Sequence, residues 1–348
     1  MKIRGVWRIR HIARRFTNLI VPPAIILLYH RVVDLRADPQ LLCVTPKHFA
    51  EHLEILRKWC RPTPLKKLGD SSPKENRLRR EVVVTFDDGY RDNLINAKPL
   101  LERYDVPATV FVTTGYLGSN REFWYDDLER IFLHPRPLPE RLRLKVNERC
   151  YEWRLDSEIG WSEEAYRSFS EWNVLQKDNP TVRHSLYRSL FEILHPLPDG
   201  DRQKILEKLA RWAGTDTLHR QTHCTLLPEE LIQLADGGLV EIGSHTISHP
   251  VLSALSVAAQ VDEISRSKSH LEELLGHPVN SFAYPFGGRS HYTEQTVAAV
   301  RQAGFTLACS NFAGVVHRGI DRWQLPRFLV RDWDGDEFAR RLKSWLDA

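Results

Sequence analysis

Short, continuously apolar segments alternate with longer segments of helical periodicity along much of this 348-residue chain. Residues 24–30 (AIILLYH) and 81–86 (EVVVTF) are rich in Leu, Ile and Val, as strands buried on both faces require. Thr45 followed by Pro46 is typical of a helix start and predicts a helix to about residue 59. Because repeated strand–helix units favour a parallel sheet, we predict an α/β fold whose sheet curls into a barrel.

The same alternation covers most of the remaining sequence. Further strands are predicted at residues 107–114, 239–243, 281–285, 306–310 and 324–330. Further helices are predicted at residues 93–104, 228–235, 256–275, 293–303 and 336–346. Between residues 119 and 224 the alternation is lost, and helical segments are expected near 123–133, 163–169, 181–194 and 202–213. We therefore divide the chain into an N-terminal segment (1–23), a first barrel part (24–118), a largely helical insertion (119–224) and a second barrel part (225–348).

Composition indicates a globular protein. Hydrophobic residues make up 42% of the chain, so a core of this size needs no disulfides. The five cysteines stand singly with no CxxC pair, which favours a reducing compartment. A net charge of +4 is too small to indicate a nucleic-acid partner.

Residues 1–20 are basic and amphipathic. Six Lys and Arg residues, with no acidic residue, alternate with apolar residues at roughly helical spacing. One interpretation is a peripheral contact with an anionic membrane surface, and the alternative is a solvated helix that packs on the domain. No apolar stretch is long enough for a signal peptide or a spanning helix, so a cytoplasmic location is expected, with a peripheral place at the inner membrane face as the variant.

Asp87 and Asp88 follow the second apolar segment directly and precede Gly89. Asp-Asp-Gly also occurs in solvated turns, but the preceding valines place this pair at the end of a rigid buried strand. His245 and His249 follow another predicted strand at a spacing that lets both imidazoles reach one ion. In parallel barrels the carboxyl ends of the strands meet at one rim, so these side chains should lie together there.

His219 and His223 share the four-residue spacing but have no strand leading into them. We expect both to be surface residues. By contrast, two imidazoles and one carboxylate at a strand rim suit a catalytic divalent ion with an open position for water. The second carboxylate is then free to act as a base toward an acidified water, which predicts a metal-dependent hydrolase.

These motifs resemble a known family. Residues 85–89 (TFDDG) and 244–250 (SHTISHP) resemble the first two motifs of the polysaccharide deacetylases, carbohydrate esterase family 4, and residues 282–287 (FAYPFG) resemble the third. The similarity covers residues 24–118 and 225–332. It implies an irregular (β/α) barrel and metal-dependent removal of acetyl groups from amino sugars.

The resemblance also implies roles for single residues. Asp87 matches the general base, and the backbone N–H of Phe286 matches the donor that stabilises an oxyanion. Tyr284 would line the same groove. The implied metal ligands are Asp88, His245 and His249.

Two departures from the family pattern need substitutes. Many members hold the catalytic aspartate with an arginine where this chain has Ala283. Arg327 is the proposed substitute, with Asp87 as its partner, because an arginine in an apolar strand needs a carboxylate. An arginine on a surface-facing edge strand is the alternative.

The other departure is a missing Leu-x-His motif near the C-terminus. In a circularly permuted branch, which includes poly-N-acetylglucosamine deacetylases, the acidic histidine lies after the first strand, as His30 does here. We therefore assign His30 as general acid, with a histidine that caps a buried strand as the alternative. Asp332 could orient His30 or end a strand.

Trp124, in the aromatic stretch of residues 123–129, could stack on a sugar or anchor the insertion in its core. The leading hypothesis is an N-deacetylase that acts on an N-acetylated glycan or a lipid-linked sugar. O-deacetylation, hydrolysis of a small amide and non-catalytic glycan binding are the alternatives. One divalent ion is expected, Zn²⁺ first, with Co²⁺, Ni²⁺ or Fe²⁺ fitting similar ligands.

Overall fold

Eight parallel strands form the central sheet of the computed structural model, which describes residues 23–68, 80–119, 121–155, 161–215, 220–317 and 319–347. The amphipathic segment 1–20, residues 69–79 and His219 lie outside the described residues. The strands are β1 (Ile25–Tyr29), β4 (Arg61–Pro62), β5 (Glu81–Phe86), β6 (Ala108–Val112), β9 (Val240–Ser244), β10 (Ser281–Ala283), β11 (Leu307–Cys309) and β12 (Phe328–Leu329). Their order is β11-β10-β9-β6-β5-β1-β12, and β4 pairs with the start of β5.

The sheet curls because the segment before β12 also pairs with the opposite edge. Leu325 forms a parallel bridge with Cys309 of β11, and the carbonyl of Leu325 accepts a hydrogen bond from the N–H of Ser310 at 2.9 Å. Three residues later the chain pairs with β1, where Phe328 lies opposite Leu27. The predicted α/β fold with a curled parallel sheet is therefore confirmed.

Strand β1 and the valines of β5 are continuously apolar because the two faces of these strands enter two different cores. Ile26, Val83 and Phe111 belong to the cluster enclosed by the curled sheet. Their neighbours Leu27 and Val84 belong to the larger cluster between the sheet and the helices. This double burial explains the continuous apolar segments in the sequence.

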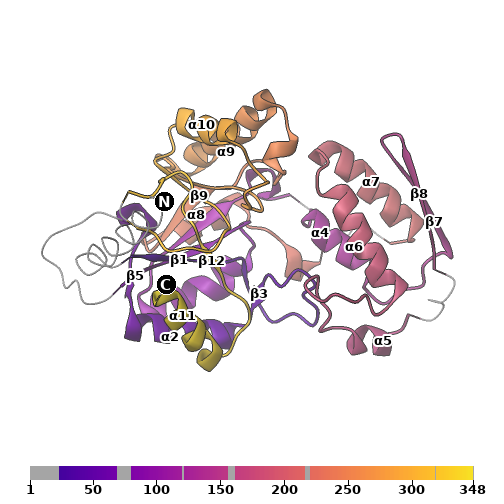
Figure 1. Ribbon diagram of the computed structural model, residues 1–348, viewed down its shortest axis with the longest axis horizontal. Coiled ribbons are helices and arrows are strands. Elements are labelled where there is room, and N and C mark those ends of the chain that lie inside the picture. Colours follow the sequence, from indigo (N-terminus) through magenta and orange to yellow (C-terminus); the bar gives the residue numbers. More distant parts are fainter. Residues whose placement is uncertain are drawn as a thin grey trace, which may run out of the picture.

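Helices cover the outer face of the sheet. They are α2 (Pro46–Trp59), α3 (Lys98–Tyr104), α8 (Pro228–Ala235), α9 (Val257–Leu275), α10 (Glu294–Gln302) and α11 (Gly335–Leu346). In Figure 1, α9 and α10 lie above the sheet and α2 and α11 below it. Thr45 caps α2 as predicted, since its hydroxyl accepts a hydrogen bond from the N–H of His48 at 3.3 Å. Among the described helices, none is both long enough and apolar enough to cross a membrane.

Short elements make up the rest of this part of the chain. The residues predicted to start the helix at 93 form a π-helical stretch, η2 (Asn93–Ala97), which continues directly into α3. A parallel pair that was not predicted, β2 (Arg31–Val32) with β3 (Cys43–Val44), follows β1. The remaining short helices are η1 (Leu65–Lys67), η3 (Thr114–Tyr116), η4 (Gln221–His223) and η5 (Leu252–Ala254).

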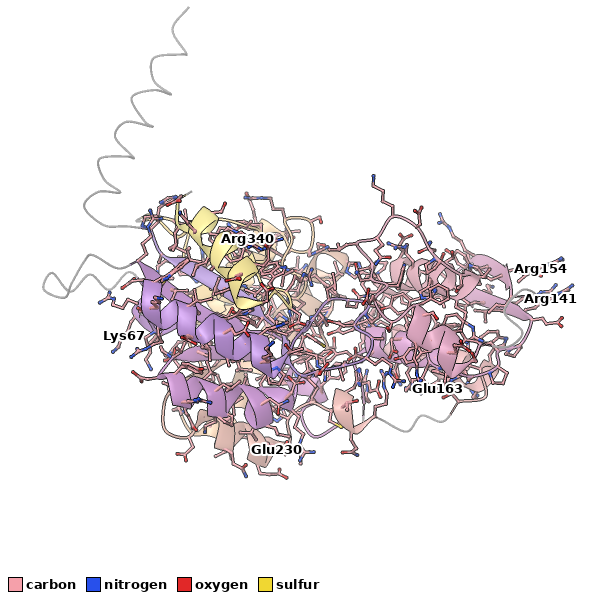
Figure 2. The ribbon with its side chains drawn as sticks, turned by 90° about the horizontal axis from the view of Figure 1, so that it is seen from below. Lys67, Arg141, Arg154, Glu163, Glu230 and Arg340 are labelled. Atoms are coloured by element: carbon pink, nitrogen blue, oxygen red, sulfur yellow. The ribbon has the colours of Figure 1, made fainter. Side chains whose placement is uncertain are left out.

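The insertion has its own hydrophobic core. Its elements are α4 (Trp124–Phe132), β7 (Arg141–Val146), β8 (Arg149–Arg154), α5 (Glu163–Ser168), α6 (Val182–Leu194) and α7 (Asp199–Trp212). Helices α4, α6 and α7 pack around a cluster that includes Leu128, Leu190 and Leu209. The antiparallel hairpin β7–β8, which was not predicted, lies at the end away from the barrel (Figure 1). Figure 2 places Arg141 and Arg154 of this hairpin far from Glu230 on α8.

One buried histidine of the barrel makes stability depend on pH. Burial lowers the pKa of His52 to about 4, against an ordinary value of 6.5. Its ring is fully buried, bonded to the carbonyl of Trp333 at 2.7 Å and stacked on Phe338. Between pH 6.5 and 4 the unfolded chain therefore binds one more proton than the native chain at this residue, so stability falls as pH falls.

We expect His52→Gln, which retains a donor and an acceptor, to remove up to about 3 kcal/mol of this pH-dependent loss. Urea unfolding at pH 7 and pH 4.5 measures the difference, and His270→Gln on the exposed face of α9 is the control. Equal pH slopes in His52→Gln and wild type would contradict a neutral buried His52.

Candidate active site

Most of the predicted site residues lie at the carboxyl ends of the strands, and Arg327 joins them from the start of β12. Asp87 and Asp88 follow β5, and His245 follows β9. The loop after β10 carries Phe286, and Arg327 immediately precedes β12. The curled parallel sheet brings these ends to one rim, as the barrel geometry predicted.

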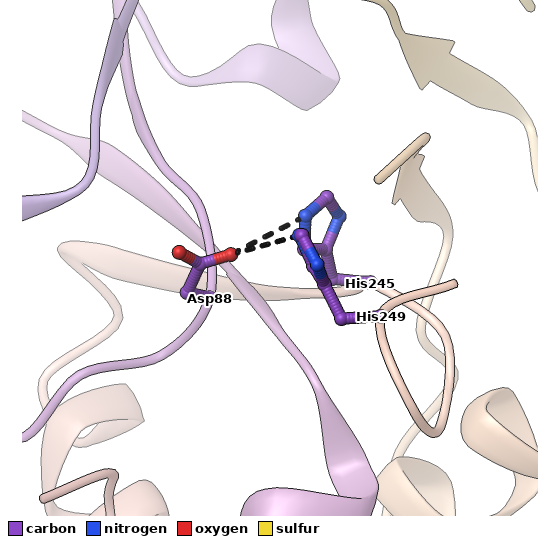
Figure 3. A group of neighbouring side chains, drawn as sticks. All are labelled: Asp88, His245 and His249. Atoms are coloured by element: carbon purple, nitrogen blue, oxygen red, sulfur yellow. Dashed lines mark ion pairs between the residues drawn. The ribbon is translucent and has the colours of Figure 1, made fainter. Parts of the chain in front are cut away.

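Asp88, His245 and His249 form a compact group of potential metal ligands. One ligand atom from each of them lies within 4.8 Å of the other two. Asp88 Oδ1 is 3.6 Å from His245 Nε2 and 3.3 Å from His249 Nε2, as Figure 3 shows. His245 Nδ1 hydrogen-bonds the carbonyl of Ala283 at 2.8 Å, which fixes the ring with Nε2 toward Asp88.

The donor set fits a divalent cation. Asp88 Oδ1 is buried and has no hydrogen-bond partner among the described residues. Burial would raise the pKa of Asp88, but His249 and the other nearby histidines lower it well below its ordinary value. Burial lowers the pKa of His245 to about 4. An ionised carboxylate and a neutral imidazole are the forms that bind a metal ion.

Backbone strain is concentrated in the loops of this site. Asp88, Thr246, His249 and Phe286 all have positive φ angles, of 78°, 69°, 54° and 59°. A left-handed conformation costs an L-residue roughly 1–2 kcal/mol. Such residues persist only where the surrounding contacts hold them, and they cluster at functional sites.

Asp87 and Arg327 form the ion pair predicted from the sequence. Arg327 Nη1 and Nη2 each donate to a different oxygen of Asp87 at 2.7 Å, and the arginine is 1% exposed. Burial would raise the pKa of Asp87, but Arg327 and then His245 lower it below its ordinary value. Asp87 is therefore ionised and fixed in orientation, with Oδ2 at 3.9 Å from His245 Nε2.

His30 lies next to this pair of carboxylates and is partly exposed. Burial lowers the pKa of its ring, and the charges of Asp88 and Asp87 partly oppose that change. Its backbone carbonyl accepts a hydrogen bond from Asn93 Nδ2 at 2.9 Å, which anchors the turn after β1. The ring of His30 therefore interacts electrostatically with both carboxylates.

The sequence profile of the polysaccharide deacetylase family matches residues 74–169 and 207–308, more than half of the chain. This chain belongs to the polysaccharide deacetylase family. A further relative is YxkH of Bacillus subtilis (strain 168), assigned by name to the polysaccharide deacetylases, which is 29% identical over 118 residues. That match spans 31% of this chain and only 38% of YxkH.

Three solved structures share the fold of this deacetylase-family chain. The deacetylase PplD of Streptococcus pyogenes, solved with acetate, has a TM-score of 0.56 at 16% identity and covers 94% of this chain and 100% of its own. IcaB of Ammonifex degensii has a TM-score of 0.56 at 18% identity, and the match covers 94% of this chain and 97% of IcaB. A de-N-acetylase of Aggregatibacter actinomycetemcomitans has a TM-score of 0.53 at 16% identity, and the match covers 92% of this chain and 99% of the de-N-acetylase.

Within the third family motif, Phe286 and Tyr284 take different positions. The half-buried ring of Phe286 packs on His249, one of the candidate ligands, with 4.6 Å between ring centroids. Tyr284 was expected to line the substrate groove, and this is wrong. Its side chain is fully buried, its hydroxyl donates to the carbonyl of Trp323, and its ring stacks on Tyr292.

Trp124 belongs to the core of the insertion, so its assignment to sugar binding is not supported. The indole is 1% exposed and packs on Phe191, with 4.6 Å between ring centroids. Asp332 does not orient His30 either. It accepts hydrogen bonds from Thr45 and His48 at the start of α2.

His223 was expected at the surface and is instead 7% exposed. Its Nδ1 hydrogen-bonds the hydroxyl of Thr222 at 2.9 Å, and burial lowers its pKa far below the ordinary value. His223 belongs to no group of three or more potential metal ligands, since the one such group among the described residues is that of Asp88, His245 and His249.

Sequence reasoning missed two residues that hold the ligand loops. Glu263 of α9 accepts hydrogen bonds from the N–H groups of Ile247 and Ser248 at 2.8 and 2.9 Å. Tyr125 of the insertion donates to Asp88 Oδ2 at 2.9 Å. Tyr125 lies in the aromatic stretch of residues 123–129, which is recognisable in the sequence. Its contact with Asp88 depends on how the insertion packs on the barrel, which the sequence does not show.

Removing Arg327 should leave a buried carboxylate without its partner. We expect Arg327→Met to lower the free energy of unfolding of the metal-free protein by about 3–5 kcal/mol. The double variant Arg327→Met/Asp87→Asn should recover a large part of this loss, because no uncompensated charge remains. Urea unfolding of wild type, Arg327→Met, Asp87→Asn and the double variant measures both effects, and a purely additive cycle would contradict the coupling of this pair.

Proposed function

We propose that this protein is a metal-dependent deacetylase that removes N-acetyl groups from an amino sugar in a polysaccharide or a glycan precursor. The observation that carries the proposal is the placement of the Asp88, His245 and His249 group directly beside the fixed carboxylate of Asp87. Membership of the polysaccharide deacetylase family supports deacetylation as the reaction. The roles of the individual residues are part of the proposal.

Asp88, His245 and His249 would hold the ion through one atom each, which leaves a position open for water. A divalent cation bound there supplies Lewis acidity and lowers the pKa of water from 15.7 toward about 7. Asp87 is ionised and held by Arg327, so it can accept the proton of the attacking water without turning away. The ion pair with Arg327 thus both orients the Asp87 carboxylate and keeps it ionised.

The N–H of Phe286 would donate to the oxyanion that develops on the acetyl carbonyl. Its left-handed backbone turns the peptide plane at this point of the loop, beside His249. His30 would protonate the leaving nitrogen. Burial keeps the pKa of His30 low in the free protein. Negative charge that develops on a neighbouring substrate would raise this pKa, so that His30 carries the proton that it gives to the leaving nitrogen.

Other substrates would use the same residues. O-deacetylation or hydrolysis of a small amide needs the same ion, base and acid, so the choice among them rests on substrate assays. A non-catalytic glycan-binding protein has no need for a base, and the Asp87–Arg327 pair favours catalysis over that alternative. The metal is proposed to be Zn²⁺, with Co²⁺, Ni²⁺ or Fe²⁺ as alternatives for a His₂Asp site.

The proposed substrate is an N-acetylated glycan, either a polymer or a lipid-linked sugar. Contact of residues 1–20 with a membrane surface and a cytoplasmic location remain predictions. They matter to the proposal only because a lipid-linked substrate would lie at such a membrane surface.

Metal content and acetate release should be lost together in His249→Ala. Wild type should bind about one divalent ion per chain, and it should release acetate from N-acetylglucosamine oligomers. His249→Ala should do neither, while His270→Ala, an exposed histidine on α9, should behave as wild type. Elemental analysis and an acetate assay measure the two quantities. A wild type that binds no Zn²⁺ or Co²⁺ would refute the proposal, and a metal-loaded but inactive wild type would redirect it to other amides or esters.

Substitutions of the two neighbouring aspartates should have different effects on metal binding and on acetate release. We expect Asp87→Asn to retain the metal and to lose acetate release by about 10²- to 10⁴-fold, because only the base is removed. Asp88→Asn should lose the metal as well, because an amide is a weaker ligand than a carboxylate. Full activity of metal-loaded Asp87→Asn would exclude Asp87 as the base.

A further inference from the structure

We infer that the insertion is a working part of the metal site, because Tyr125 of α4 positions the ligand carboxylate of Asp88. This inference rests on the proposed function in one respect, namely that Asp88, His245 and His249 hold a divalent ion. The hydroxyl of Tyr125 donates to Asp88, and not to Asp87 or His30, which are the proposed base and acid. It is a positioning residue supplied from outside the barrel.

The two oxygens of Asp88 have separate surroundings. Oδ1 faces Nε2 of His245 and of His249, and no described residue hydrogen-bonds it. Oδ2 accepts the hydroxyl of Tyr125 at 2.9 Å. The hydroxyl therefore fixes the rotation of the carboxylate and leaves Oδ1 toward the imidazoles, where an ion would be bound.

The backbone alone does not hold Asp88 in this orientation. Asp88 has a φ of 78° and lies at the turn between β5 and Gly89, outside the strand ladder. Its carbonyl accepts one hydrogen bond, of 3.3 Å, from the N–H of Thr113. A side chain on a strained turn needs a partner that limits its rotamers, and Tyr125 provides that partner.

Tyr125 is itself held rigidly. The ring is 5% exposed and stacks on Phe123, with 5.4 Å between centroids and an angle of 5°. The ring of Phe123 in turn lies edge-on to His249 at 5.6 Å. The next residue in the helix, Asp126, accepts the hydroxyl of Tyr90 at 2.7 Å, which ties α4 to the loop that follows β5.

A second contact joins the insertion to the other ligand loop. Arg202 of α7 is fully buried, and its Nη2 donates to the carbonyl of Ser248, next to His249, at 3.1 Å. Tyr125 and Arg202 thus reach the two loops that supply the ligands from two helices of one core. The position of the insertion on the barrel and the geometry of the Asp88, His245 and His249 group are therefore coupled.

The test is the Zn²⁺ affinity of Tyr125→Phe, a change that removes only the hydroxyl. Competition with a chelating dye should show about 10- to 100-fold weaker Zn²⁺ binding than in wild type, the usual effect of losing a partner of a ligand. Zn²⁺ should accordingly raise the melting temperature of the variant less than that of wild type.

Tyr187→Phe is the matched control. Tyr187 is a fully buried tyrosine of the same core, and its hydroxyl accepts from Gln40 Nε2 at 2.6 Å, away from the ligand group. We expect Tyr187→Phe to bind Zn²⁺ as wild type does, even where its melting temperature without metal falls. Equal weakening in both variants would show a general loss of packing and would overturn the assignment.

The two proposals fail separately. If wild type binds Zn²⁺ and Tyr125→Phe binds it equally tightly, the role of Tyr125 is refuted and the proposed function stands. If wild type binds neither Zn²⁺ nor Co²⁺, the proposed function fails, and the inference that depends on it fails with it.

Discussion

The buried ion pair between Arg327 and Asp87 links the closure of the barrel to its chemistry. Arg327 lies in the segment that joins the two edges of the curled sheet, and Asp87 directly follows β5. Both side chains are buried, and a buried charge is tolerated only with its partner, so separating the two strand ends would leave each charge unpaired. The interaction that keeps the rim closed also keeps the carboxylate ionised and oriented.

The parts of this architecture that follow from local chemistry could be predicted from sequence. Strands buried on both faces must be apolar throughout, which identified β1 and β5. An arginine among apolar residues needs a carboxylate, which identified Asp87 as the partner of Arg327. Tyr284 was misplaced because its direction depends on alternation along the strand. Ala283 faces the barrel interior, so Phe282 and Tyr284 face the helices.

Features of the insertion were harder to predict. The residues of β7 do alternate, with Leu142, Leu144 and Val146 buried between exposed cationic residues, and this period of two was a signal for a strand. The contact of Tyr125 with Asp88 has no such signal, since it depends on how two separate cores pack. Sequence patterns therefore located the candidate ligand residues but not Tyr125 and Glu263, which contact them or their loop.

The left-handed residues at the rim have a consequence for how this protein can change. Asp88, Thr246, His249 and Phe286 hold conformations that glycine adopts without penalty. Replacing Thr246 by glycine would relieve strain in the loop between the two histidines, yet it would also free the backbone that spaces them. Selection for thermal stability alone would therefore act against these residues, so their positions are those at which stability and the geometry of the candidate ligand group place opposite demands on the chain.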